Sequence, residues 1–371
     1  MNSDKKIKVV VTGTRGIPDI QGGVETHCKE LFPRIAAKGI DVTIIRRKGY
    51  VNDNLSSYKG VSLYDIPNFK SKTFEAIFHT FRAIWAAKYK FHADIVHIHA
   101  TGPAILTFLA RWLGLKVVFT HHGPDYERDK WNKLAKSVIR FGERMGCTRA
   151  NKIIVISNVI NDIVKKQYGR NDAHLIYNGV NPPTIVNDTD YLSGLGIEAR
   201  KYVFAMGRFV EEKNFHSLIE AFSNLKQTEY KLVIAGKADI ENNYSRKLES
   251  IAKEKNVILT GFIKGNELHT LLSNARLFAI PSSHEGLPIS LLEAMSYGLP
   301  VLASDIPANK EVGLDESYYF HYDKKDCVSN LTKALKSRLD DKSIQQYDLS
   351  IYNWDKIAEQ TMDVYLEIMQ A

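Results

Sequence analysis

The sequence predicts an α/β protein made of two doubly wound, Rossmann-like domains, each built on a parallel sheet. Short runs rich in β-branched residues alternate with helix-period segments through both halves of the chain, as in parallel sheets covered by helices on both faces. The length of 371 residues exceeds one ordinary α/β core and suits two. A polar stretch with one glycine and two prolines, residues 178–190, separates the two series.

The first domain is expected to span residues 1–178. It opens with a strand, a glycine-containing loop and a helix over residues 24–37 that is closed by Gly39. Its strands are predicted at residues 7–12, 42–45, 95–99, 117–120 and 153–156.

The second domain, residues 179–352, repeats this scheme. Its strands are predicted at residues 202–206, 231–235, 257–259, 277–280 and 301–303. A last helix begins at Asn353, a good N-cap residue, and carries apolar residues at helical spacing through residue 371. This helix could pack on either domain.

The composition is that of a globular protein, which we expect in the cytoplasm. Apolar residues make up 44% of the chain and charged residues 25%. No segment has the roughly eighteen uncharged apolar residues of a membrane span, and the N-terminus lacks the apolar stretch of a secretion signal. The cysteines are too scattered for a disulfide framework or a metal-ligand cluster: Cys28, Cys147 and Cys327.

The charge is distributed unevenly. Residues 1–178 carry a net charge of +14 and the remainder −6, which gives the total of +8. An anionic partner is therefore expected for the first half. No nucleic-acid-binding signature is present, so we expect no nucleic acid and favour an anionic membrane surface.

Residues 69–92 carry an apolar stripe with cations around it. The pattern fits a helix packed on the first sheet, and also a helix whose rim meets the membrane interface. The stripe consists of Phe74, Ile77, Phe78, Phe81, Ile84 and Trp85, and the cations are Lys70, Lys72, Arg82, Lys88 and Lys90.

Glu285 and Glu293 flank the start of a predicted helix. The surrounding segment has the pattern of a strand, a glycine-containing turn and a helix that begins near Ile289. The N–H groups and partial positive charge of a helix start suit a diphosphate. Both carboxylates can face one pocket and bind sugar and ribose hydroxyls, although two solvated glutamates on an ordinary strand–turn–helix would give the same pattern.

Arg208 and Lys213 follow the first strand of the second domain. Together they can neutralise a diphosphate, the arginine as a fork and the lysine as a point charge. The alternative is a pair of surface cations beside Glu211 and Glu212. In the first domain, the glycines of the loop 13–23 let the backbone approach a ligand closely, but the loop lacks the nicotinamide-binding fingerprint.

Four histidines end two strands of the first domain, at the sheet edge where doubly wound proteins build their sites. We place His122, which precedes Gly123, in the ligand-binding cleft. At least one of the other histidines is expected only to satisfy buried hydrogen bonds. No acidic or cysteine ligand accompanies them at a suitable spacing, so no metal site is expected. The four are His97, His99, His121 and His122.

Five segments follow one another over residues 7–312: GTRG…GGVET, THHG, YNGV, GRFVEEKN and HEGLPISLLEA. As a set they resemble the retaining family-4 glycosyltransferases of GT-B fold, in which two Rossmann-like domains face each other across a cleft. The opening loop and the DYERDKW segment are most similar to a branch that includes bacterial rhamnosyltransferases of capsule and cell-wall polysaccharide synthesis.

The resemblance implies roles for the second-domain candidates. Arg208 and Lys213 would bind the donor diphosphate. Glu293 would hold the ribose hydroxyls, and Glu285 would hold the transferred sugar. The backbone of the turn and helix start would line the phosphate and sugar site, namely Gly286, Leu287, Pro288 and Ile289, of which the proline offers only its carbonyl.

In the first domain, the resemblance implies that Gly22 and Gly23 close over the donor. His122 would contact the sugar near its reacting carbon, although the doubled histidine leaves the choice between His121 and His122 open. The last helix, residues 353–371, would pack back onto the first domain.

The sequence therefore predicts a cytoplasmic glycosyltransferase, peripheral on the membrane. It would move a hexose or deoxyhexose from a UDP-, dTDP- or GDP-linked donor to a hydroxyl of a glycan or lipid-linked acceptor in bacterial surface polysaccharide synthesis. The resemblance implies retention at the anomeric carbon and no obligatory metal or other cofactor. Two alternatives are a nucleotide-sugar epimerase of the same fold and a non-catalytic sugar-nucleotide-binding component of a polysaccharide assembly.

Overall fold

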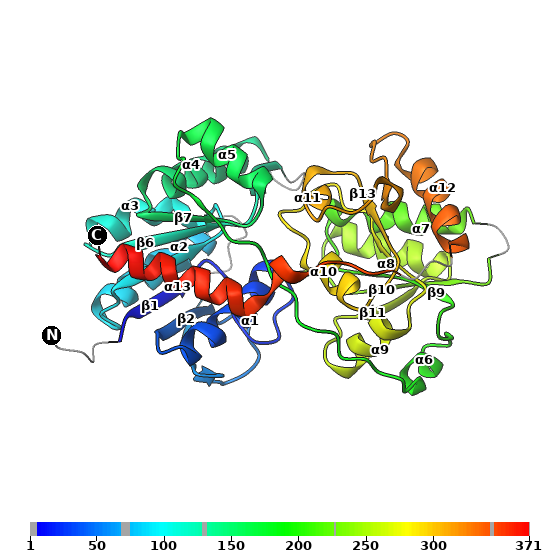
Figure 1. The fold of residues 1–371 in the computed structure, drawn as a ribbon, viewed down its shortest axis with the longest axis horizontal. Coiled ribbons are helices and arrows are strands. Elements are labelled where there is room, and N and C mark those ends of the chain that lie inside the picture. The colour runs from blue at the N-terminus through cyan, green and yellow to red at the C-terminus, as the bar shows by residue number, and fades with distance from the viewer. Residues whose placement is uncertain (1–5, 68–74, 128–131, 226–227, 342–344, 371) are drawn as a thin grey trace. The chain divides into compact units, whose positions relative to one another are not determined.

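The structure, a computed structural model, divides the chain into two compact units (Figure 1). The first comprises Met1–Gly179 and Tyr352–Ala371, and the second comprises Val180–Ile351. Each unit is a Rossmann-like domain with helices on both faces of its sheet. The residues described are 6–67, 75–127, 132–225, 228–341 and 345–370.

The first unit contains an eight-stranded sheet of order β3-β4-β2-β1-β5-β6-β7-β8. All neighbours are parallel except the edge pair β3 and β4. Strands β2, β3 and β4 lie on one side of β1, and β5 pairs with the other side of β1. The direction in which strands are added to the sheet therefore reverses between β1 and β5. The strands are β1 (Lys8–Thr12), β2 (Asp41–Arg47), β3 (Ser57–Tyr58), β4 (Val61–Ile66), β5 (Ile95–His99), β6 (Lys116–His121), β7 (Lys152–Val155) and β8 (His174–Leu175).

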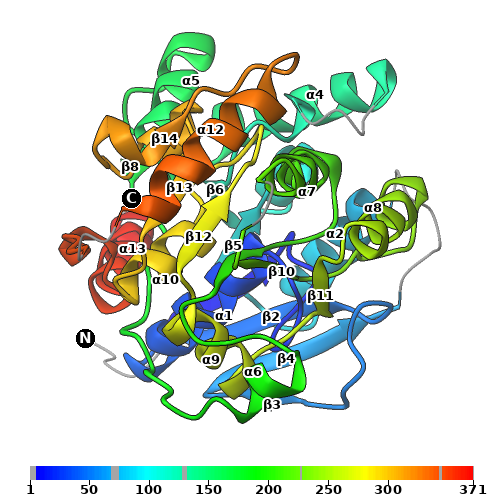
Figure 2. The ribbon, with the colours of Figure 1, turned by 90° about the vertical axis from the view of Figure 1, so that its right-hand side faces the viewer.

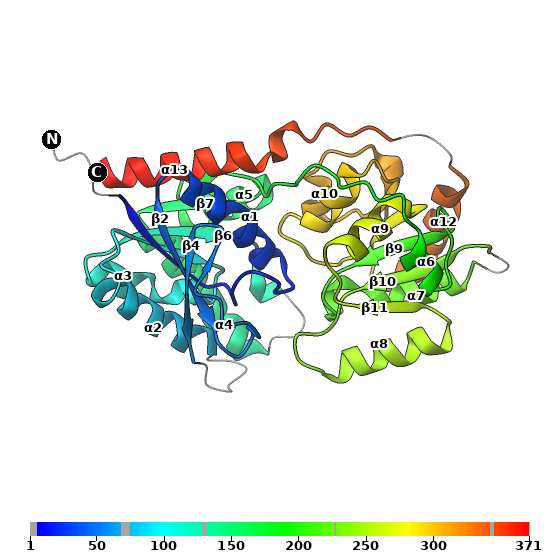
Figure 3. The ribbon, with the colours of Figure 1, turned by 90° about the horizontal axis from the view of Figure 1, so that it is seen from below.

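Helices cover both faces of this sheet (Figure 3). On one face, α1 (Gly23–Ala37) packs beside α13 (Trp354–Gln370). On the other face lie α2 (Glu75–Tyr89), α3 (Thr107–Trp112) and α4 (Lys133–Arg149). Helix α5 (Asn158–Tyr168) joins β7 to β8 and begins where the Ser157 hydroxyl accepts a hydrogen bond from the Ile160 N–H.

Helix α13 belongs to the first unit although it follows the second unit in the sequence. Its apolar stripe, which includes Trp354 and Tyr365, is buried in one core with α1 and the sheet. The Tyr365 hydroxyl lies 2.6 Å from Nδ1 of His97 on β5. At the rim, the Lys38 ammonium lies 2.8 Å from the Glu359 carboxylate.

The second unit contains a six-stranded parallel sheet of order β11-β10-β9-β12-β13-β14. Its order reverses between β9 and β12, as that of the first sheet does between β1 and β5. The strands are β9 (Tyr202–Met206), β10 (Lys231–Ala235), β11 (Ile258–Gly261), β12 (Leu277–Ile280), β13 (Val301–Ser304) and β14 (Tyr319–Phe320).

Helices again cover both faces (Figure 2). On one face, α7 (Phe215–Ser223), α8 (Asn243–Glu254) and α12 (Cys327–Asp340) enclose a core that includes Phe215, Leu248 and Leu331. On the other face lie α9 (Asn266–Asn274) and α10 (Ile289–Ser296). The remaining short helices are α6 (Asp190–Gly194) and α11 (Pro307–Lys310).

The fold class expected from the sequence is confirmed, and the ten expected strands all coincide with strands of the structure. Over the described ranges, no helix is both long enough and apolar enough to cross a bilayer. Lys70, Lys72 and Phe74 of the amphipathic segment lie outside the described residues, as do residues 128–131 of the DYERDKW segment.

Candidate functional site

Most of the candidate residues follow strands that flank the two points where strand order reverses, whereas His122 follows β6 and Glu293 lies on α10. In an open parallel sheet, the loops that leave two such strands diverge to opposite faces and open a crevice between them, where ligands bind. Arg208 and Lys213 follow β9, and Glu285 follows its neighbour β12. In the first unit, the glycine-containing loop follows β1, and His99 ends its neighbour β5.

Lys213 and Glu285 form an ion pair in the second unit. Nζ of Lys213 lies 2.5 Å from Oε1 of Glu285, and the side chains are 17% and 11% exposed. Lys213 ends a short 3₁₀ turn, Glu211–Lys213, after β9. The Ser283 N–H donates to the Glu212 carbonyl over 2.9 Å, which joins this turn to the loop after β12. The two loops therefore hold the opposite charges together.

The charge state of Glu285 follows from this pair. Burial alone would raise its pKa, but the neighbouring Lys213 ammonium, by charge and by hydrogen bonding, brings the pKa below the ordinary value. The carboxylate is therefore ionised at neutral pH and can accept hydrogen bonds from hydroxyl groups. The ammonium of Lys213 has two further N–H donors to offer to an anion.

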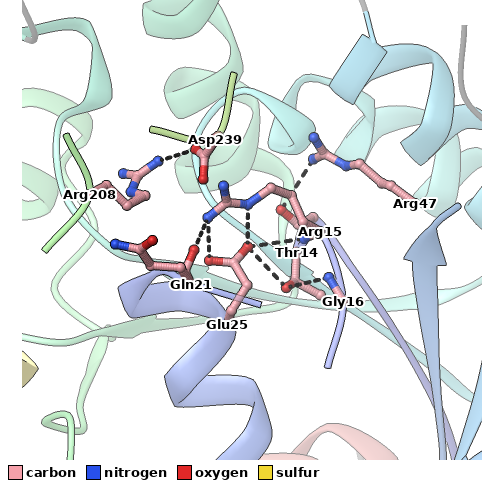
Figure 4. A network of polar contacts seen from close by, with 9 residues as sticks. Thr14, Arg15, Gly16, Gln21, Glu25, Arg47, Arg208 and Asp239 are labelled. Carbon is pink, nitrogen blue, oxygen red and sulfur yellow. Dashed lines mark hydrogen bonds and ion pairs between the residues drawn. The ribbon is translucent and has the colours of Figure 1, made fainter. Parts of the chain in front are cut away.

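Arg208 is paired with a residue that sequence reasoning missed. Its Nη1 lies 3.0 Å from Oδ2 of Asp239, which follows β10 (Figure 4). The two side chains are 20% and 28% exposed. The two cations are therefore not simply paired with the adjacent glutamates: each forms an ion pair with a carboxylate on another loop, and the Glu212 side chain is buried. No sequence spacing links residues 208 and 239, which meet because β9 and β10 are neighbours.

The turn before α10 offers its backbone. The helix begins at Ile289, as expected, with Pro288 as N-cap, and the Pro288 side chain makes no capping hydrogen bond. Leu287 and Ile289 bury their side chains, and Gly286 has none, so only main-chain groups of these residues can face a ligand. Glu293 lies in the second turn of the helix and is half-buried. An anion at this helix start would be stabilised by the free N–H groups and the helix dipole.

In the first unit, a buried carboxylate organises the loop between β1 and α1 (Figure 4). Oε1 of Glu25 accepts hydrogen bonds from the Thr14 hydroxyl (3.3 Å) and from the backbone N–H of Arg15 (3.1 Å). The Arg15 guanidinium binds both carboxylate oxygens, at 3.0 and 2.9 Å, and donates to the Gln21 carbonyl over 2.6 Å. These contacts tie both ends of the loop together, and sequence reasoning did not single out Arg15 or Glu25.

Gly22 and Gly23 differ in what surrounds them. Gly22 is the N-cap of α1 with φ of 151°, and a Cβ there would overlap the Glu25 carboxylate and the Arg15 guanidinium. A Cβ on Gly23 would meet nothing within 4 Å among the described atoms. A side chain at position 22 would therefore be strained and would displace the Arg15–Glu25 contacts, whereas position 23 is open on the side where a ligand could approach.

Two of the four histidines satisfy buried hydrogen bonds. His97 bonds the Tyr365 hydroxyl and, at 2.6 Å, the Thr120 hydroxyl. His121 accepts from the Gly123 N–H through Nδ1, so its Nε2 carries the proton and donates to Glu143 over 2.7 Å. Both rings are buried.

His122 lies in a cluster with His99 and His27. Its Nε2 is 2.9 Å from Nδ1 of His99, and its ring centre is 4.9 Å from that of His27. Nδ1 of His27 donates to Oδ1 of Asn178 over 2.9 Å, which leaves Nε2 of His27 unprotonated. His27 lies on α1, and sequence reasoning missed it.

All three rings are neutral at physiological pH. Burial lowers the pKa of His27 to about 4 and holds the pKa values of His99 and His122 well below the ordinary range. One ring nitrogen from each lies within 4.8 Å of the others, near enough for three neutral imidazoles to share a metal ion. The 2.9 Å between the nitrogens of His99 and His122 matches a hydrogen bond, whereas two nitrogens on one tetrahedral zinc stand about 3.3 Å apart.

Family models match both units. Residues 21–183 match the model described as Glycosyltransferase Family 4, and residues 190–353 match Glycosyl transferases group 1. The chain thus carries the paired domains of a GT-B glycosyltransferase, and the protein is a glycosyltransferase.

Relatives match along almost the whole chain. The uncharacterized glycosyltransferase MJ1607 of Methanocaldococcus jannaschii is 23% identical over 95% of this chain and 96% of its own length. The Escherichia coli UDP-Gal:alpha-D-GlcNAc-diphosphoundecaprenol alpha-1,3-galactosyltransferase is 24% identical over 94% of each chain. Anabaena Alr3699/HepE in complex with UDP-glucose has a TM-score of 0.73 at 15% identity, covering 97% of this chain and 100% of that chain. This last likeness shows the shared fold.

Proposed function

We propose that the protein transfers a hexose or deoxyhexose from a nucleoside-diphosphate sugar to a hydroxyl of a glycan or lipid-linked acceptor, with retention at the anomeric carbon. The donor is UDP-, dTDP- or GDP-linked, and the product belongs to bacterial surface polysaccharide. The observation that carries the proposal is the Lys213–Glu285 pair at the reversal point of the second sheet. It sets a cation for a diphosphate beside an ionised carboxylate for sugar hydroxyls.

Each residue then has a task. Lys213 and Arg208 bind the diphosphate, together with the N–H groups at the start of α10. Glu285 accepts hydrogen bonds from the transferred sugar, and Glu293 accepts them from the ribose. His122 donates or accepts a hydrogen bond at the sugar near its reacting carbon, held in place by His99.

Charge stabilisation drives the transfer. The bond between the anomeric carbon and the diphosphate oxygen breaks, and its electron pair leaves with the diphosphate. Lys213, Arg208 and the start of α10 stabilise the developing negative charge. The acceptor oxygen bonds to the same face of the anomeric carbon, and its proton passes to an oxygen of the departing diphosphate.

The reaction is proposed to need no metal, because the diphosphate charge is met by these side chains and main-chain groups. We expect full turnover after treatment with a chelator. We also expect the purified protein to hold less than one zinc ion per chain. Loss of turnover on chelation and its recovery with Zn²⁺ would assign the His27–His99–His122 cluster to a metal instead. A reducing compartment such as the cytoplasm suits the three cysteines, which are all free and buried.

The donor is tested first by thermal shift with UDP, dTDP, GDP and ADP, since a ligand that binds only the folded state raises the melting temperature. The nucleotide that gives the largest shift defines the donor to be assayed. Related proteins supply starting points: the Escherichia coli relative is named for UDP-Gal, and the Anabaena structure contains UDP-glucose. No shift with any of the four would contradict the proposal.

Transfer is tested with Lys213→Ala and Glu293→Ala. Each should lower turnover by roughly a hundredfold or more while the melting temperature of the free protein changes little for Glu293→Ala. The matched controls are Lys247→Ala and Glu249→Ala on the exposed face of α8, which should keep full activity. Without acceptor, slow donor hydrolysis should first release the sugar anomer that the donor carries. Release of the opposite anomer would reject retention, and rearranged nucleotide sugar would favour the epimerase.

A further inference from the structure

The face formed by α2, α3 and α4 holds an unusual share of the exposed aromatic side chains. Eight Phe, Trp or Tyr residues are exposed among the described residues, and seven of them are on these three helices. Trp112 is 79% exposed, which is rare for so large a ring. The seven are Phe78, Phe81, Trp85, Tyr89, Phe108, Trp112 and Phe141.

The rings on α2 form a continuous ladder. Phe81 and Trp85 are stacked with their centres 6.1 Å apart, and Trp85 and Tyr89 are 4.8 Å apart. They stand at positions i, i+4 and i+8, on the solvent side of the helix. Beside them a shallow groove of about 410 Å³ is lined by Phe81, Trp85 and Arg82 from α2 and by Tyr64 and Ile66 from β4.

The solvent-facing charges of the same helices have one sign. The only two acidic residues on α2, α3 and α4 are turned inward: Glu143 is fully buried with His121, and Glu75 lies 3.6 Å from the Arg47 guanidinium. Eight cations lie on the three helices, namely Arg82, Lys88, Arg111, Lys133, Lys136, Arg140, Arg144 and Arg149. The face is therefore both aromatic and positively charged.

We propose that this face docks the protein on an anionic lipid bilayer. Tryptophan and tyrosine favour the boundary between headgroups and acyl chains, where the ring is buried and its polar atom stays hydrated. Lysine and arginine beside them meet the lipid phosphates, at about 1 kcal/mol for each cation near the surface. The bilayer is the occupant that uses both features.

Other occupants use only one of them. A second copy packed on the same face would bring two positive surfaces together, which repel. A nucleic acid would engage the cations but would not require exposed tryptophans on α2 and α3. The inference does not depend on the donor, the acceptor or the chemistry proposed above.

Vesicle co-sedimentation of the full chain tests the proposal. The vesicles are phosphatidylcholine alone, or phosphatidylcholine mixed with phosphatidylglycerol. The test variants are Trp85→Ser with Trp112→Ser, and Lys133→Glu with Arg144→Glu. The controls make comparable changes in the second unit: Ile185→Ser with Ile240→Ser removes two apolar side chains that are 59% and 55% exposed, and Lys247→Glu with Lys253→Glu reverses two charges on α8.

The unaltered protein should bind the anionic vesicles, and each test variant should reduce the partition coefficient roughly tenfold or more while the controls keep it. Added salt should weaken binding. Equal binding to neutral and anionic vesicles, no binding to either, or equal losses in the test and control variants would overturn the proposal. A dimer in sedimentation velocity would also overturn the proposal if the Trp85→Ser with Trp112→Ser variant alone were monomeric. The aromatic face would then be the contact with a second copy. Transfer to a soluble acceptor should be unchanged, which separates a failure here from a failure of the enzyme proposal.

Discussion

Replacing Lys213 by methionine should destabilise the folded protein as well as stop transfer. The substitution keeps the length and apolar stem of the side chain but removes the ammonium that lies 2.5 Å from Glu285. The Glu285 carboxylate, 11% exposed, then remains in place without its nearest cation. Breaking a buried ion pair on one side costs about 3–5 kcal/mol, because a buried charge is left uncompensated.

The structure favours the lower end of that range. Both side chains retain some exposure, so water can partly solvate the remaining charge, and we expect a loss of about 3 kcal/mol for Lys213→Met. Glu285→Gln should lose less, about 1–2 kcal/mol, because the flexible lysine can turn to solvent. In the double variant no charge remains to be compensated. The free energy of unfolding lost in the double variant should therefore be about 1–3 kcal/mol less than the sum of the losses in the two single variants.

The double-mutant cycle compares the parent protein, the two single variants and the double variant. Their urea denaturation is followed by far-ultraviolet circular dichroism at neutral pH. The amplitude assigned to the second unit supplies the free energies of unfolding. Additive losses in the double variant would refute the reasoning, since they would mean that the two charges do not interact in the folded protein.

Three further predictions concern the first unit. Gly13→Ala should destabilise it by about 3 kcal/mol or more, because φ is +98° and the added Cβ overlaps the His99 carbonyl; a melting temperature within a degree or two of the parent would contradict this. Gly23→Ala should melt normally yet weaken donor binding in calorimetry, whereas unchanged affinity would place the donor away from this helix start. The pKa of His27 is lowered from 6.5 to about 4 by burial, so the unfolded chain alone takes up this proton as pH falls through that window. His27 alone should contribute a drop of about 3 kcal/mol in the free energy of unfolding over this window, and His27→Gln should flatten the slope in urea titrations at several pH values; an equally steep slope in the variant would argue against the assignment.

The sheets were predictable because their strands are short, β-branched and separated by helical periods. Both faces of a parallel sheet are buried, so the sequence of each central strand is almost uniformly apolar. Strands β3, β4, β8 and β14 lie outside the expected segments. Three of these are two-residue strands at or near a sheet edge, too short to create a periodic signal.

The candidate site was predictable in its parts but not in its contacts. The glutamates and cations of the second domain stand out in sequence because each follows an apolar strand. Their pairing depends on strand order: Lys213 meets Glu285 because β12 pairs with β9, and Arg208 meets Asp239 because β10 does. A pattern along the chain carries no information about which strands are neighbours.

Residues of the first domain were missed for a related reason. Arg15 and Glu25 are ten positions apart, a spacing that corresponds to no regular period, and an irregular loop brings them together. His27 lies on α1 among residues whose helical period indicates only packing, and its position beside His99 and His122 requires the helix to be placed on the sheet.

The position of α13 has a consequence for synthesis on the ribosome. Residues that complete the core of the first unit, among them Trp354 and Tyr365, are translated only after the whole of Val180–Ile351. At roughly 5–20 residues per second, the nascent first unit must wait on the order of ten seconds or more for them. Throughout that interval the apolar side of α1 and its sheet lacks its cover and is available to chaperones. The second unit, whose segments are contiguous, can finish folding first although it is made later.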